Sequence, residues 1–172
     1  SPLNADDPDR DKFIMSKGHS VEAYYAVLAE KGFFDIKDVI AKFSKFGSKF
    51  IGHPNNKLPG IEMNSGSLGH GLPVSVGMAL AGKMDDRDYR VYTVMGDGEL
   101  AEGSVWEGAM SAGNYKLDNL CVIIDLNGLQ IDGTNDQVMP VGDPCAKFAA
   151  FGFETVKVDG HDIQAIVDAI QA

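Results

Sequence analysis

Apolar residues in the first half of the chain recur every three or four positions. This period is typical of helices that bury one face, and it predicts helices over 19–31, 36–43 and 72–83. Gly32 ends the first pattern, and Asp35 stands where a cap would begin the second. The stretch 52–71 follows no period and is rich in glycine and proline. It predicts a long loop, and loops of this length inside a domain are usually functional or disordered.

From residue 90 onward, continuous apolar runs alternate with helical patterns. Such runs are typical of strands in a parallel sheet that are joined by crossover helices. The order predicts strands over 90–96, 120–126 and 154–158, with helices over 103–116, 143–151 and 162–171. This alternation indicates an α/β fold with a doubly wound, mainly parallel sheet. Residues 1–12 are rich in proline and aspartate, so we expect a flexible arm there and one domain over 13–172.

Composition narrows the classes of partner. The chain has 172 residues and a formal net charge of −10, which argues against nucleic acid or an anionic membrane as a main partner. Two cysteines do not make a disulfide framework, and no apolar stretch is long enough to span a bilayer. The charged N-terminus lacks the apolar core of a signal peptide, so we expect a cytoplasmic protein. Because it begins without Met and ends in a helical pattern, we expect a piece of a longer chain.

Two short polar sequences follow the two longest predicted strands. Gly96-Asp97-Gly98 ends the first strand, and Asp125-Leu126-Asn127-Gly128-Leu129 ends the second. If these strands are neighbours, Asp97 and Asn127 lie side by side at one sheet edge, about 5 Å apart. A carboxylate and an amide oxygen suit Mg²⁺ or Ca²⁺, and Mg²⁺ completes its shell with phosphate oxygens and water. The sequence therefore predicts a metal site that holds a diphosphate.

Other interpretations of these residues remain open. Each glycine-containing segment alone is typical of a turn. A dinucleotide site is the weaker alternative, because Gly96-Asp97-Gly98 lacks the third glycine, and 66–71 has its glycines in another order and follows no strand. A bare phosphate would meet the charges of Asp97, Glu99 and Glu102, and a metal ion would relieve that repulsion.

Six motifs, in order along the chain, resemble the thiamine diphosphate-binding part of transketolases. The resemblance runs from about residue 9 to the end, and the closest variety is the short N-terminal subunit of split, two-gene transketolases. The motifs are Ser16-Lys17-Gly18-His19, Gly52-His53-Pro54, Gly66-Ser67-Leu68-Gly69-His70-Gly71, Gly96-Asp97-Gly98 with Glu102-Gly103 and Glu107, Lys116-Leu117-Asp118, and Asp125 to Gly133.

The resemblance implies thiamine diphosphate and Mg²⁺ (or Ca²⁺) as cofactors. Asp97, Asn127 and the backbone carbonyl of Leu129 would bind the metal, and Gly98 and Asn127 would touch the diphosphate. Ile131 would pack on the thiazolium.

The resemblance assigns the remaining cofactor contacts to residues 66–69, called the glycine loop below, and to one histidine. Gly66 and Leu68 would contact the aminopyrimidine through their backbones, with Ser67 between them as part of the cofactor site. His19 would lie near the diphosphate.

His53, His19 and Glu102 are the catalytic residues that the resemblance implies. His53 would lie near the reactive carbon and the donor sugar's hydroxyls, and Glu102 at the subunit interface with Glu107. The chain departs from the family at His70, where Gln is commoner, which leaves the role of His70 open.

The implied activity is transfer of a two-carbon ketol unit from a ketose phosphate to an aldose phosphate. The chain would act with a pyrimidine-binding transketolase half, in a homodimer or a heterotetramer, on sugar phosphates. Alternatives are another thiamine-diphosphate enzyme such as a deoxyxylulose-phosphate synthase, or a non-catalytic subunit that keeps the fold. A simple nucleotide-binding module is the weakest of them.

Overall fold

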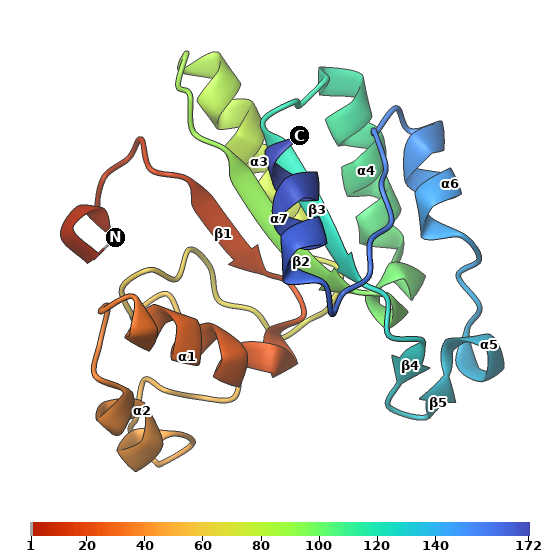
Figure 1. Cartoon of the computed structure of the whole chain (residues 1–172). Coiled ribbons are helices and arrows are strands. Elements are labelled where there is room, and N and C mark those ends of the chain that lie inside the picture. Colours follow the sequence, from red (N-terminus) through yellow and green to blue (C-terminus); the bar gives the residue numbers. More distant parts are fainter. Residues whose placement is uncertain (1) are drawn as a thin grey trace.

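A three-stranded parallel sheet lies at the centre of the computed structural model, which describes residues 2–172 (Figure 1). The strands are β1 (Lys12–Met15), β2 (Val91–Gly96) and β3 (Leu120–Asp125), and they lie side by side in the order β1-β2-β3. Because all three run in the same direction, their carboxyl ends meet at one edge of the sheet. A separate two-stranded antiparallel hairpin, β4 (Leu129–Gln130) and β5 (Gly133–Thr134), follows β3.

Helices connect the strands and follow them. They are α1 (Val21–Glu30), α2 (Ile36–Lys42), α3 (Gly71–Met84), α4 (Gly103–Tyr115), α5 (Asn135–Val138), α6 (Pro144–Ala150) and α7 (Ile163–Gln171), with short 3-10 turns η1 (Pro2–Asn4), η2 (Gly18–Ser20) and η3 (Gly98–Ala101). Between residues 2 and 172, no helix has both the length and the apolar character that crossing a bilayer requires.

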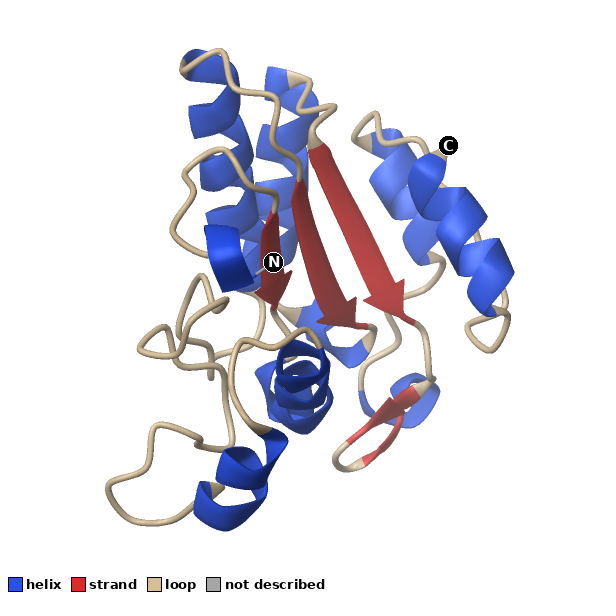
Figure 2. Cartoon of the chain, turned by 60° about the vertical axis from the view of Figure 1, so that its left-hand side comes forward, coloured by secondary structure: helices blue, strands red, loops and turns tan. Residues whose placement is uncertain are grey.

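The sheet has helices on both sides, which confirms the predicted α/β class. Figure 2 shows α3 and α4 on one side of the strands and α7 on the other. Helix α1 and the β4–β5 hairpin lie beyond the arrowheads, which mark the carboxyl ends of the strands. The predicted helices over 19–31, 36–43, 72–83, 103–116, 143–151 and 162–171 are all present, with ends that differ by one or two residues.

Two apolar cores hold these layers together. The larger core lies between the sheet and helices α3, α4 and α6, and includes Leu72, Val91, Met95 and Val105, each at most 1% exposed. The smaller core lies under α1 and α2 and is built around Tyr25, which is fully buried. The Tyr25 ring makes edge contacts with three phenylalanines, Phe34, Phe43 and Phe50. The second core supports the long loop that leads to the carboxyl edge of the sheet.

One predicted strand is absent from the structure, and one strand of the structure was not predicted. Residues 154–158 form neither helix nor strand, and Val156 is 67% exposed. An apolar run becomes a strand only where another strand pairs with its backbone, and within residues 2–172 nothing pairs with the outer side of β3. Conversely, β1 was missed because only four residues, next to a charged segment, form it. Pairing with β2 supplies the hydrogen bonds that its short apolar pattern did not predict.

The residues before β1 make several polar contacts with the rest of the chain. Arg10 forms an ion pair with Glu62, and Arg87 Nη1 lies 2.5 Å from an oxygen of Asp9. Ser1, the first residue of the expected flexible arm, lies outside the described residues, and the flexibility of 1–12 stays a prediction.

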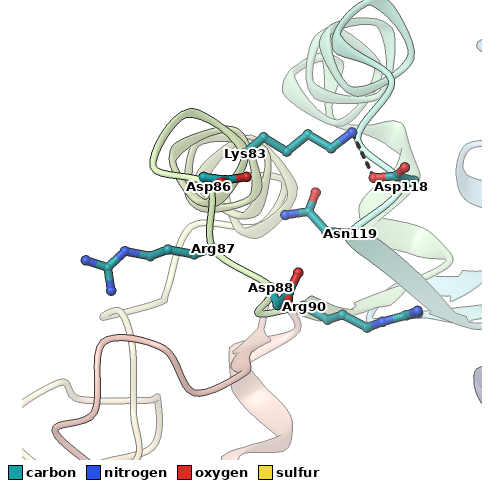
Figure 3. A pocket seen from close by; sticks show the side chains of 7 residues that line it. All are labelled: Lys83, Asp86, Arg87, Asp88, Arg90, Asp118 and Asn119. Carbon is teal, nitrogen blue, oxygen red and sulfur yellow. Dashed lines mark ion pairs between the residues drawn. The ribbon is translucent and has the colours of Figure 1, made fainter.

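One pocket of about 450 Å³ lies at the amino ends of the strands (Figure 3). Arg90 and Asn119, which precede β2 and β3, form part of its lining, together with Lys83 and Asp118. Lys83 and Asp118 pair across it at 2.8 Å. This pocket is therefore at the opposite end of the sheet from Asp97 and is separate from the predicted metal site.

Two helical glycines differ in what surrounds them, which gives a test of the packing. A Cβ on Gly113 in α4 would lie 1.9 Å from the backbone carbonyl oxygen of Phe151, whereas a Cβ on Gly77 in α3 would meet nothing within 4 Å. We expect Gly113→Ala to lower the free energy of unfolding by about 1–3 kcal/mol, because backbone must move to admit the methyl group. Gly77→Ala should leave it unchanged or raise it by up to about 1 kcal/mol. Urea unfolding followed by circular dichroism measures both, and equal effects would contradict the α4–α6 packing.

Candidate metal and diphosphate site

The carboxylate of Asp97 joins the ends of two neighbouring strands. Gly96 of β2 pairs with Asp125 of β3, so the residues that follow them leave the sheet at the same edge. Asp97 is 1% exposed. Its Oδ1 accepts a hydrogen bond from the Gly98 N–H at 2.8 Å, and its Oδ2 accepts one from the Gly128 N–H at 2.6 Å. One side chain thus fixes the turn after β3 against the turn after β2.

Asn127 is held by the residues around it. Its Nδ2 donates to Asp125 Oδ2 at 3.2 Å, and its Oδ1 accepts from the Leu129 N–H at 2.9 Å. Lys17 Nζ also donates to Asp125 Oδ2, at 2.5 Å, and forms an ion pair with it. This hydrogen bond and the positive charge of Lys17, with a smaller contribution from Asn127, lower the pKa of Asp125 against the opposing effect of partial burial. The charged Asp125 therefore anchors the Asn127 amide.

The ligands that the resemblance implies would fit a hard divalent cation. They are the Asp97 carboxylate, the Asn127 amide oxygen and the Leu129 backbone carbonyl, and oxygen ligands of this kind suit Mg²⁺ or Ca²⁺. Nowhere in residues 2–172 do three or more His, Cys, Asp or Glu side chains cluster as a metal site. Mg²⁺ commonly takes one or two protein side chains and completes its shell with phosphate oxygens and water, which agrees with the donors present.

Glycines on either side of the Asp97 carboxylate leave the backbone there without side chains. A Cβ on Gly98 would lie 3.0 Å from Cγ of Gln130 and 3.5 Å from Oδ1 of Asn135. Gly128 has φ +76°, a left-handed conformation that side chains other than glycine rarely adopt. These two positions let the backbone N–H groups of both turns approach a ligand or the Asp97 carboxylate closely.

A second buried carboxylate, Glu99, connects three segments of the chain. Its side chain accepts hydrogen bonds from the Gly69 N–H at 2.8 Å, from the Gly96 N–H at 3.1 Å and from the Ser16 hydroxyl. Glu99 is 2% exposed. The sequence alone marks Glu99 only as a negative charge, because nothing in the local pattern shows that the glycine loop folds back onto it.

Gly69 is tightly enclosed at the start of α4. It has φ +82°, and a Cβ there would lie 2.6 Å from Cβ of Glu102 and 2.7 Å from Oγ of Ser104. The Ser104 hydroxyl donates to the Gly69 carbonyl at 2.9 Å. The structure therefore brings Gly69, at the end of the glycine loop, against the base of the Glu102 side chain, while the Glu102 residue as a whole stays exposed.

His53 lies against the turn that carries His19. A Cβ on Gly18 would lie 2.0 Å from Oγ of Ser65 and 3.0 Å from Cδ2 of His53, so only glycine fits there without movement. Tyr25 donates its hydroxyl hydrogen bond to the backbone carbonyl of His53 at 3.1 Å. The His19 residue is exposed. The two predicted histidines thus belong to adjoining segments.

The other predicted site residues lie at the surface. Gly66, Ser67 and Leu129 are exposed, Leu68 is half-buried, and Ile131 is fully exposed despite its apolar side chain. Among residues 2–172, no hydrogen bond joins these five to Asp97. The structure therefore brings the strand-end residues together directly, and connects them to the glycine loop through Glu99 and Ser16.

Comparison with known proteins gives one consistent result. The family profile described as "Transketolase, thiamine diphosphate binding domain" matches residues 1–172. An apulose-4-phosphate transketolase subunit of Phocaeicola vulgatus is 50% identical over 158 residues, which is 92% of this chain and 56% of the relative. The subunit of the same name from Actinobacillus succinogenes is 43% identical over 172 residues, covering 99% of this chain and 62% of the relative.

Solved structures agree with the sequence relatives. The transketolase of Campylobacter jejuni superposes with a TM-score of 0.94 at 32% identity, over 99% of this chain and 28% of that one. A transketolase of Pichia stipitis superposes with a TM-score of 0.91 at 34% identity, over 99% and 27%. The chain spans 56% and 62% of the length of the two curated relatives, and about a quarter of the transketolases of known structure.

The Lys17–Asp125 ion pair makes a prediction about pH. Because the folded-state pKa of Asp125 is lowered, the stability that the pair adds is present above the pKa of the unfolded chain and is lost as pH falls through the folded value. We expect Lys17→Met to raise the Asp125 pKa toward its ordinary value, whereas Lys42→Met, which removes the exposed lysine paired with Asp38, should leave the Asp125 pKa where it is. Carboxyl-carbon NMR titration measures the shift, and an unchanged Asp125 pKa in Lys17→Met would disprove the assignment.

Proposed function

Since this chain belongs to the family of transketolase thiamine diphosphate-binding domains, we propose that it is the diphosphate- and metal-binding part of an active transketolase. The reaction would move a two-carbon ketol unit from a ketose phosphate to an aldose phosphate. The observation that carries the proposal is the Asp97 carboxylate, which spans the β2 and β3 turns and places an anionic oxygen donor beside Asn127.

In this proposal, the strand-end residues hold the metal ion and the diphosphate. Asp97, the Asn127 amide oxygen and the Leu129 carbonyl would bind Mg²⁺ or Ca²⁺, and Gly98 with Asn127 would contact the diphosphate. The metal ion would have a second role, because its positive charge would screen the diphosphate from the negative charge of Asp97. Lys17, through Asp125, keeps the Asn127 amide in one orientation.

The exposed residues would contact the rest of the cofactor. The backbones of Gly66 and Leu68, with Ser67 between them, would bind the aminopyrimidine. Ile131 would cover the thiazolium, which gives its fully exposed apolar side chain a partner. His19 would lie near the diphosphate.

Thiamine diphosphate supplies the nucleophilic carbon that accepts the ketol unit, and the chain supplies orientation and proton transfer. His53 would hold or move a proton at the donor sugar's hydroxyls, because a neutral imidazole has one nitrogen that donates a proton and one that accepts it. The imidazole lies against Gly18, in the segment that leads into His19, so both histidines would act on the same side of the site. Glu102 would act at the interface with the second half of the enzyme.

We propose that a pyrimidine-binding transketolase half completes the site. The two curated relatives described above are each named as one subunit of a transketolase, which implies a second subunit in those enzymes. The assembly would be a homodimer or a heterotetramer, in which Asn127, Leu129 and Ile131 face the partner half. Their exposure in this chain supports that arrangement.

A test of the metal site uses Asp97→Asn. The amide turns one of the two acceptors into a donor that opposes a backbone N–H, and it removes the charge that would bind the cation. We expect Mg²⁺-dependent binding of thiamine diphosphate to weaken by more than the ~10–100-fold that loss of a supporting residue costs. Isothermal titration calorimetry with and without Mg²⁺ measures this. Asp118→Asn, at the opposite end of the sheet, is the matched control and should bind as the unchanged protein does.

A test of the reaction compares substrate pairs in the complete enzyme. Ketose phosphates, including apulose 4-phosphate, should give ketol transfer when they are paired with aldose phosphates. Pyruvate with glyceraldehyde phosphate should give none. The reverse outcome would favour a deoxyxylulose-phosphate synthase. Cofactor binding without turnover of either pair, in the presence of the partner half, would favour a non-catalytic subunit. The chain without a partner half should show no turnover.

A further inference from the structure

We propose that Glu99 is a positioning residue that fixes the glycine loop 66–69 against the metal-binding edge of the sheet. The inference rests on the proposed function and adds to it a residue that touches neither the metal nor the cofactor. Glu99 would set the distance between the two places where thiamine diphosphate is held, namely the strand ends for the diphosphate and the glycine loop for the aminopyrimidine.

The hydrogen bonds of Glu99 connect these two places directly. Oε1 accepts from the Gly69 N–H at 2.8 Å and from the Ser16 hydroxyl, while Oε2 accepts from the Gly96 N–H at 3.1 Å. Gly69 ends the glycine loop, and Gly96 directly precedes Asp97. A single carboxylate therefore links the loop to the strand that carries the proposed metal ligand.

The environment of Glu99 makes this link rigid. The residue is 2% exposed, and a buried carboxylate that gives up a hydrogen bond loses an interaction that water cannot replace. Three donors from three segments satisfy it, and within residues 2–172 it forms no ion pair. Among the described residues, the hydrogen bonds of this carboxylate all come from N–H and O–H groups of the chain itself.

Two further hydrogen bonds hold the end of the glycine loop, where the chain enters α3. The Ser16 hydroxyl that donates to Glu99 also accepts from the Gly71 N–H at 3.1 Å. Ser104 donates to the Gly69 carbonyl at 2.9 Å. The N–H and the carbonyl of Gly69 are therefore both held, and the loop's exit into α3 is fixed through Ser16.

The diphosphate end of the site does not depend on Glu99 in the same way. Asp97 is held by the Gly98 and Gly128 N–H groups, and β2 is held by its ladder to β3. A change at Glu99 should therefore move the glycine loop while leaving the strand-end donors in place. This difference separates a positioning role from a general loss of structure.

The test compares two ligands that share the diphosphate part. The complete enzyme, with its pyrimidine-binding half, is titrated with thiamine diphosphate and with inorganic pyrophosphate, each with Mg²⁺. Glu99→Gln places an amide donor against one of the three donors that the carboxylate accepts. Ser16→Ala removes the hydroxyl that bridges Glu99 and Gly71 but keeps the other two bonds of Glu99.

We expect both variants to weaken thiamine diphosphate binding by about tenfold or more, the effect of losing a hydrogen bond to a charged group. Pyrophosphate binding should change by less than about threefold in the same variants. Ser75→Ala is the matched control, because Ser75 is also a fully buried serine, but its hydroxyl bonds to the Gly71 carbonyl inside α3. It should bind both ligands as the unchanged enzyme does.

Three outcomes would overturn the inference. Equal losses of thiamine diphosphate and pyrophosphate binding would show that Glu99 holds the whole site, and unchanged binding of both would show that it holds neither part. Failure of both variants to fold, judged by near-ultraviolet circular dichroism, would make Glu99 a residue of fold stability. If the unchanged enzyme itself binds no thiamine diphosphate, the proposed function fails, and that result is distinct from the other three.

Discussion

The carboxylate of Asp97 is the contact on which the candidate site depends. Parallel strands bring their carboxyl ends to one edge, but the turns that follow them are free to diverge unless something holds them. Asp97 prevents this by accepting hydrogen bonds from the turn after its own strand and from Gly128 in the turn after β3. The parallel strands bring the two turns close together, and the hydrogen bonds of this one carboxylate fix the turns relative to each other.

Two acidic residues, Asp97 and Glu99, are buried two positions apart, and neither forms an ion pair with any of residues 2–172. Each is satisfied by hydrogen bonds to N–H or O–H groups, which offsets part of the cost of removing a carboxylate from water. The two carboxylates connect different segments. Asp97 connects two strand ends, whereas Glu99 connects a strand end to the glycine loop. Lys17, which follows the Ser16 that donates to Glu99, pairs with Asp125, and Asp125 in turn accepts a hydrogen bond from Asn127.

The sequence predicted the elements whose periods are clear, including every helix from α1 to α4. It also predicted that Asp97 and Asn127 would share a sheet edge if their two strands were neighbours, and β2 and β3 do pair. It did not predict β1, whose four residues become a strand only by pairing with β2, nor the contact of Gly69 with Glu99. Both depend on segments far apart in the chain, and no local pattern encodes them.

The exposure of the remaining site residues follows from the same geometry. Asp97 is buried because the chain alone completes its hydrogen bonds, whereas Asn127, Leu129 and Ile131 stand on a turn and hairpin that have no layer over them. The apolar side chain of Ile131 is fully exposed, and an apolar partner would remove its surface from water. A thiazolium ring and a second domain would cover it. In the proposed assembly, this chain would hold the charged end of the ligand, and the partner half would enclose its apolar parts.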